Sequence, residues 1–143
     1  MRRCRREIYG VDDYAALTQE FQYNWDDSVT GGTHSAANAI FAANVDSDSA
    51  IEILTGGEST FPDPTGTKGQ LTILDWNNIA ITEETRQSWV HHVGAPQAKF
   101  VRGVYALDVE PDNVVEILTG GETFDNGSNY RVGQLRIWNW KSS

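Results

Sequence analysis

The chain has 143 residues and a formal net charge of −9, with 20 acidic against 11 basic side chains. A length of roughly 150 residues suits one domain, and a field of this sign repels phosphate backbones, which argues against nucleic acid as a partner. No apolar run approaches the roughly 18 residues of a membrane-spanning helix, and Cys4, the single cysteine, excludes an intrachain disulfide. We therefore expect one aromatic-rich globular domain without a membrane span.

The segment 1–13 differs from the rest of the chain in its charge. Four of its first six residues are arginine, and a short partial strand, Glu7–Val11, is expected to follow them. Because no apolar stretch follows the arginines, the segment does not have the pattern of a secretory signal and is interpreted as a solvated basic terminus. The compartment is therefore not assigned from the sequence: either the protein stays inside, or the chain was cut from a longer precursor.

The remainder of the chain repeats itself with a period of 64 residues. The heptapeptide Glu-Ile-Leu-Thr-Gly-Gly-Glu occurs at Glu52–Glu58 and again at Glu116–Glu122, and the same offset aligns Gly69–Leu71 with Gly133–Leu135 without a gap. Similarity at a fixed period indicates a repeat architecture. The two units are Tyr14–Asn77 and Asn78–Lys141.

Each unit contains four short runs rich in β-branched and aromatic residues, separated by Gly, Asn, Asp and Pro, which is typical of β-strands. In chain order the runs are Ala15–Trp25, Ala39–Val45, Ile51–Thr55, Gln70–Trp76, Ile79–Val90, Gly103–Val109, Val115–Thr119 and Gln134–Trp140. The Thr-Gly-Gly segments at Thr55–Gly57 and Thr119–Gly121 are interpreted as the turns that end two of these strands.

The polarity of the runs indicates their order in a sheet. Ala15–Trp25 and Ile79–Val90 are mostly polar and are expected at the outer edge, whereas Gln70–Trp76 and Gln134–Trp140 are apolar on both faces and are expected to be buried on both sides. Four antiparallel strands with a polar outermost strand describe a blade of a β-propeller. The predicted fold class is therefore all-β with propeller-type blades, and the alternative is an ordinary β-sandwich.

The tryptophans also fall in register. Trp25 aligns with Trp89 and Trp76 with Trp140, so these rings are expected to be structural and to lie between blades, and Trp138 is expected in the core. The alternative function for repeated aromatic residues is a carbohydrate-binding platform.

An acidic loop between the second and third runs of each unit is the strongest candidate for a chemical site. Oxygen-bearing side chains occupy loop positions 1, 3, 5 and 9 in both copies, and hard cations such as Ca²⁺ prefer six to eight oxygen ligands. The carbonyl groups of Ala50 and Val114, at position 7, are further candidate ligands. The alternative is a metal-free turn in which the acids accept backbone hydrogen bonds. The candidate ligands are Asn44, Asp46, Asp48 and Glu52 in the first loop, and Asp108, Glu110, Asp112 and Glu116 in the second.

These loops, together with the stretches VEILTGG and GQLRIWNW, resemble the FG-GAP or VCBS-type repeat family, whose blades carry a D-x-D-x-D-G-x-x-D/E loop. The resemblance covers nearly the whole chain after the arginine-rich start. It implies a propeller like that in the head of integrin α subunits, an extracellular setting, and Ca²⁺ held by Asp46, Asp48 and Glu52 and by Asp108, Asp112 and Glu116. The loops depart from the family pattern at position 6, where Ser49 and Asn113 replace glycine.

Two units do not close a propeller, which needs roughly four to eight blades. The chain offers an unpaired outer run at its start and lacks one after its last blade, which suits head-to-tail closure of three or four chains into a ring. The alternative is that the chain is a piece of a longer propeller. We expect a non-enzymatic binding or scaffold module that self-assembles. The alternative functions are a lectin-like carbohydrate binder and a fragment of a larger propeller protein or enzyme.

Overall fold

The computed structural model describes residues 19, 21–25, 33–46, 48–62, 66–89, 99–110, 112–124 and 130–140. Within these ranges the fold is all-β, with two antiparallel sheets and no helix. Sheet A has the order β1 (His34–Ala43), β2 (Glu52–Thr60), β3 (Thr67–Trp76) and β4 (Ile81–Trp89), and sheet B has the order β5 (Lys99–Leu107), β6 (Glu116–Phe124) and β7 (Arg131–Trp138). The expected partial strand Glu7–Val11 and most of the expected strand Ala15–Trp25 lie outside the described residues, and residues 21–25 belong to neither sheet.

The connections within sheet A follow from its turn residues. Between β2 and β3, the backbone N–H of Phe61 donates to the carbonyl of Gly66, whose φ of 61° suits a residue without a side chain. Between β3 and β4, the Asn77 side chain accepts hydrogen bonds from the backbone N–H groups of Ile79 and Ala80, and Asn78 has a φ of 66°. Asparagine tolerates both roles better than most residues, so the Asn-Asn pair fixes this turn.

The expectation that Thr-Gly-Gly forms a turn is wrong in both copies. Thr55–Gly57 lies in the middle of β2 and Thr119–Gly121 in the middle of β6. A Cβ atom on Gly57 would lie 1.8 Å from the carbonyl oxygen of Ala36, and one on Gly121 would lie 1.9 Å from that of Phe100. Glycine is needed here because the neighbouring strand approaches too closely for a side chain.

That close approach occurs beside an irregularity in each sheet. The register between β1 and β2 shifts between Ala37 and Ala39, and the register between β5 and β6 shifts between Val101 and Gly103, at positions 64 residues apart. Such bulges twist and bend the strand that carries them. Both sheets are therefore bent at corresponding points of their first strands.

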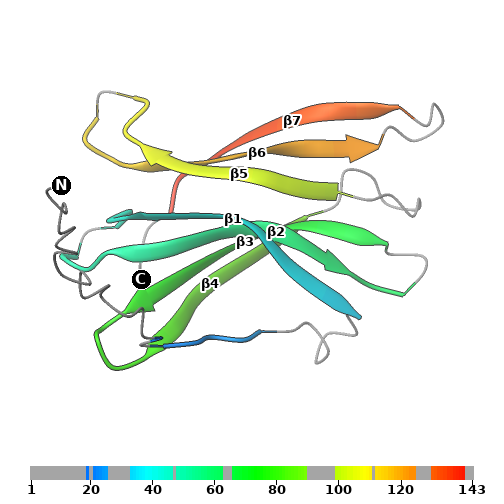
Figure 1. Cartoon of the computed structure of the whole chain (residues 1–143). Helices are drawn as coiled ribbons and strands as arrows, with labels where there is room; N and C mark the ends of the chain where they lie inside the picture. Colours follow the sequence, from blue (N-terminus) through cyan, green and yellow to red (C-terminus); the bar gives the residue numbers. More distant parts are fainter. Residues whose placement is uncertain are drawn as a thin grey trace, which may run out of the picture.

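The two sheets stack as two layers, with β5 of sheet B lying over sheet A (Figure 1). The core lies between the layers and joins Leu54, Leu71 and Ile73 of sheet A to Val104 and Ile117 of sheet B. Burial of such side chains contributes roughly 1.5–3 kcal/mol each. The sheets are therefore held together by an apolar interface.

Burial of the two long apolar strands differs. As expected, β3 is buried on both sides along most of its length. In β7 the expectation fails, because Leu135 and Ile137 are 67% and 58% exposed in this single chain. The reason is positional: sheet B covers one face of sheet A, and no described residue covers sheet B in the same way.

Candidate metal site

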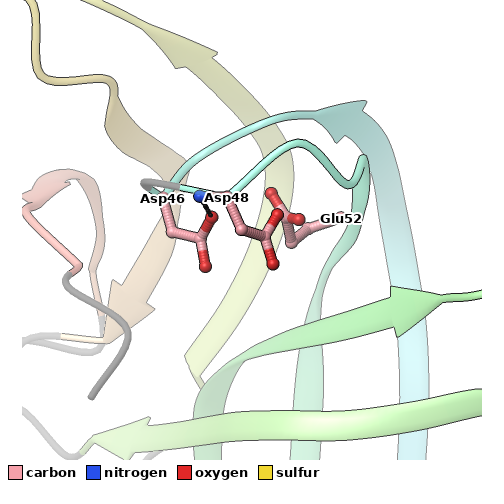
Figure 2. A group of neighbouring side chains, drawn as sticks. All are labelled: Asp46, Asp48 and Glu52. Carbon is pink, nitrogen blue, oxygen red and sulfur yellow. Dashed lines mark hydrogen bonds between the residues drawn. The ribbon is translucent and has the colours of Figure 1, made fainter.

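Three carboxylates of the first acidic loop gather at one end of sheet A. Asp46 and Asp48 extend from the loop between β1 and β2, and Glu52 is the first residue of β2. One carboxylate oxygen from each lies within 4.8 Å of the others, and Figure 2 shows the three groups side by side beneath the loop. The structure thus brings together three of the four residues predicted from this loop.

Backbone hydrogen bonds hold these carboxylates in place. The N–H of Val45 donates to Oε2 of Glu52 at 2.7 Å, and the N–H of Asp48 donates to Oδ1 of Asp46 at 2.8 Å. The N–H of Ala50 donates to Oδ1 of Asp48 at 2.6 Å. The acids therefore stabilise the turn in the manner of the metal-free interpretation, while each carboxylate retains a second oxygen.

Asn44 has a different role from the other three predicted residues. Its side-chain Nδ2 donates to the backbone carbonyl of Asp48 at 2.6 Å, which closes the loop across its base. Asn44 thus supports the position of Asp48 through the backbone.

Burial and like charge both act on Glu52, whose side chain is almost fully enclosed. Burial raises its pKa above the ordinary value, the hydrogen bond from Val45 lowers it, and the charges of Asp46 and Asp48 raise it further. The net direction is upward. A buried carboxylate with negative neighbours gains most from a cation or a proton.

Two acids outside the loop extend this negative region. Asp75 of β3 pairs with Glu52 in register, and Glu84 of β4 occupies the bulge where the register shifts between Ile73 and Leu74. Glu84 is exposed at the surface, but partial desolvation raises its pKa, and the charges of Glu52, Asp46, Asp75 and Asp48 raise it further. The alternation of β3 placed Asp75 on the same face as Leu71 and Ile73, but the bulge that places Glu84 near the loop had no signal in the sequence.

The second acidic loop shares two backbone hydrogen bonds with the first but lacks the same gathering of charge among the described residues. Glu116 accepts a hydrogen bond from the N–H of Val109 at 2.9 Å, as Glu52 does from Val45, and Asp112 accepts one from Val114 at 2.9 Å. Oδ2 of Asp108 accepts from the N–H of Asn113, and the carbonyl of Glu110 accepts from that of Asp112. Among the described residues, the acids of this loop do not form a group of three.

The departure from glycine at position 6 is resolved differently in the two loops. Asn113 has a φ of 63°, the left-handed conformation that asparagine tolerates, whereas Ser49 is not among the described residues with a positive φ. The two loops therefore differ in backbone conformation at this position.

A second feature is a pocket of about 470 Å³ on the face of sheet A that points away from sheet B. Tyr23 and Trp25 line it from outside the sheet, and Ile40, Ile53 and Leu74 line it from the sheet. The two aromatic rings stack at 6.0 Å, and Nε1 of Trp25 donates to Oε1 of Gln70 at 3.4 Å. The carbohydrate platform predicted from the tryptophans stays a prediction.

Comparisons of the chain with protein-family models, with curated proteins and with solved structures found no match. In the part of the chain that the structure describes, no helix is long and apolar enough to cross a membrane.

Proposed function

We propose that this protein is a non-enzymatic scaffold module that assembles head to tail with copies of itself. In this assembly the two sheets act as blades of a β-propeller, and Ala15–Trp25 of one chain adds a fourth strand to sheet B of the next. A contact of this kind uses two different surfaces and closes into a ring when the rotation fits. Three or four chains provide the six or eight blades of such a ring.

The observation that carries this proposal is the equivalent placement of two tryptophans. Trp89 ends β4 of sheet A, but its Nε1 donates to Gln134 of sheet B at 3.0 Å, so a strand of one sheet is anchored on the next. Trp25 donates to Gln70 of sheet A, and both members of this pair lie 64 residues before their counterparts. Trp25 therefore has the anchor of a β4-like strand, while residues 21–25 belong to no described sheet.

The edge that would receive this strand is β7. It pairs with β6 on one side, and no described strand pairs with its other side. In sheet A the corresponding edge of β3 is covered by β4. An unpaired edge presents backbone donors and acceptors that pair readily with another strand.

The mass of the protein in solution tests the proposal. At micromolar concentration we expect sedimentation equilibrium to give three or four times the chain mass of 15.9 kDa. Leu135→Lys, which places a charge on the exposed face of β7, is expected to give single chains, whereas Ile79→Lys, in the exposed turn before β4, is expected to keep the assembly. A wild-type protein that sediments as a single chain would contradict the proposal.

We further propose that the first acidic loop binds Ca²⁺, through Asp46, Asp48 and Glu52. The specific observation in its favour is the proximity of these three carboxylates, next to Glu84 and Asp75, at a site where the pKa of Glu52 is raised. Carboxylate and carbonyl oxygens are the ligands that Ca²⁺ prefers. The second loop, with Asp108, Glu110, Asp112 and Glu116, is the weaker candidate, and the resemblance to FG-GAP repeats supports both.

Calorimetry with Ca²⁺ and with EGTA tests the calcium proposal. Ca²⁺ at about 100 times its dissociation constant stabilises the folded state by about 2.7 kcal/mol, which raises Tm by several degrees. Asp48→Asn keeps an oxygen for the N–H of Ala50 but removes the charge, so we expect it to abolish the shift. The matched variant Asp112→Asn should keep it. An unchanged wild-type Tm would reject calcium binding.

A further inference from the structure

The two sheets of the chain pack through unlike faces. Sheet A contributes a face that includes Leu54, Leu71 and Ile73, and we call this its inner face. Sheet B contributes a face that includes Val101, Val104, Ala106 and Ile117, its inner face. Because successive side chains of a strand point to opposite faces, each sheet also has an outer face that points away from the other sheet.

On its second and third strands, the outer face of sheet B repeats apolar and glycine positions of the inner face of sheet A. Five such positions, 64 residues apart, are identical, whereas on the first strands Gly103, Tyr105 and Leu107 replace Ala39, Phe41 and Ala43. These side chains are buried or half-buried in sheet A, whereas Leu135 and Ile137 of sheet B are exposed. The identical residues on the outer face of sheet B are Leu118, Gly120, Gly133, Leu135 and Ile137, and their counterparts are Leu54, Gly56, Gly69, Leu71 and Ile73.

The outer face of sheet A in turn corresponds to the inner face of sheet B. Ile40 takes the place of Val104, Ala42 that of Ala106, and Ile53 that of Ile117. Ile40 is 71% exposed, although its counterpart is buried in the core. One chain thus carries both halves of the apolar interface that joins its own two sheets, and Ile40 of one half and Leu135 and Ile137 of the other are exposed.

Two glycines show what the exposed face of sheet B is shaped to receive. A Cβ atom on Gly56 would lie 2.3 Å from Cγ2 of Val104, so sheet B can lie over β2 only because Gly56 has no side chain. One on Gly69 would lie 2.8 Å from the ring of Trp89. Glycine inside a strand marks a place where another group approaches closely.

The counterparts of these glycines are open. A Cβ atom on Gly120 or on Gly133 would meet nothing within 4 Å among the residues that the structure describes. Glycine weakens a strand, and at an uncovered position no close contact requires it. We therefore explain Gly120 and Gly133 by groups that cover them in an assembly. By the 64-residue correspondence, those groups are Ile40 over Gly120 and Trp25 over Gly133.

We propose that the outer face of sheet B binds the outer face of sheet A of a second copy. The two sheets would have the same relative position as sheets A and B within one chain, and we call this relative position the docking register. This inference rests on the proposed self-assembly and specifies its contact surface. Trp25 supports this arrangement, because it contacts Gln70 of sheet A as Trp89 contacts Gln134 of sheet B.

A volume exchange between Gly120 and Ile40 tests the register. In Gly120→Val the added side chain has free space in the single chain but collides with Ile40 of the neighbour, so we expect roughly tenfold weaker association or more, with an unchanged circular dichroism spectrum. The double variant Gly120→Val with Ile40→Ala should recover much of this loss. Ile79→Val, at an exposed position outside both faces, is the control and should assemble like the wild type.

Sedimentation equilibrium of the four proteins separates the outcomes. An assembled wild type, a dissociated Gly120→Val variant and a recovered double variant support the docking register. If Gly120→Val assembles as strongly as the wild type, or if Ile40→Ala recovers nothing, the register is wrong while self-assembly stands. If the wild type is a single chain, self-assembly itself fails and the docking surface with it.

Discussion

At the scale of single residues, Glu52 combines two opposing effects. Its carboxylate accepts the hydrogen bond from the N–H of Val45, which stabilises the start of β2, and its negative charge is buried beside Asp46 and Asp48. Loss of the acceptor leaves a buried donor unsatisfied, at a cost of about 1–3 kcal/mol. Loss of the charge alone removes the repulsion from Asp46 and Asp48 and the cost of burying a negative charge.

Replacement of Glu52 separates these two effects. Burial raises the pKa of Glu52 in the folded state above its pKa in the unfolded chain. Glu52 therefore stabilises the fold when the pH is below the unfolded-state pKa, and this contribution is lost as the pH rises through the folded-state pKa. Without metal, Glu52→Gln should therefore be more stable than the wild type at pH 7, and the advantage should shrink near pH 4. Glu52→Ala should lose about 1–3 kcal/mol at pH 7.

Urea unfolding in EGTA at both pH values measures these differences. Glu116→Gln is the control for the amide replacement, because Glu116 accepts the same hydrogen bond from Val109 without an adjacent group of carboxylates among the described residues. An advantage of Glu52→Gln that grew as the pH fell would contradict the assignment of the buried charge.

At the scale of elements, the sequence predicted the strands well and their ends poorly. Alternation and β-branched composition located the strands later seen as β3 and β4, and their order in the sheet is as predicted. The Thr-Gly-Gly segments were misassigned because glycine marks both turns and close strand contacts. Only the position of the Ala36 carbonyl, which depends on the bulge in β1, distinguishes the two cases for Gly57.

The candidate site was predictable to a similar extent. The spacing of Asp46, Asp48 and Glu52 within a short loop correctly predicted that their side chains lie together, whereas the same spacing in the second loop does not gather its acids among the described residues. The sequence did not reveal Glu84, which reaches this region through a register shift between β3 and β4. Local spacing in a loop is read directly from the sequence, whereas a contribution from a distant strand depends on the register of the sheet.

At the scale of the whole molecule, Trp89 joins the two sheets both by a hydrogen bond and by packing in their shared core. The ring of Trp89 packs against Trp138 with centroids 4.9 Å apart, while its Nε1 donates to Gln134. Trp89 thus belongs to sheet A by hydrogen-bond pairing and to the core by packing. A sheet of three strands such as sheet B buries only one face, so its stability depends on this interface.

Trp89→Ala should therefore destabilise the whole molecule and not sheet A alone. We expect a loss of about 3–5 kcal/mol in urea unfolding followed by circular dichroism, at a fixed chain concentration, since the change removes a buried ring and its hydrogen bond to Gln134. Trp76→Ala is the matched control, because Trp76 is half-buried, contacts Phe21 and lies outside the core cluster, and it should cost less. Equal losses in the two variants would show that Trp89 does not couple the sheets, whereas a larger loss at Trp89 in one cooperative transition assigns the coupling to this side chain.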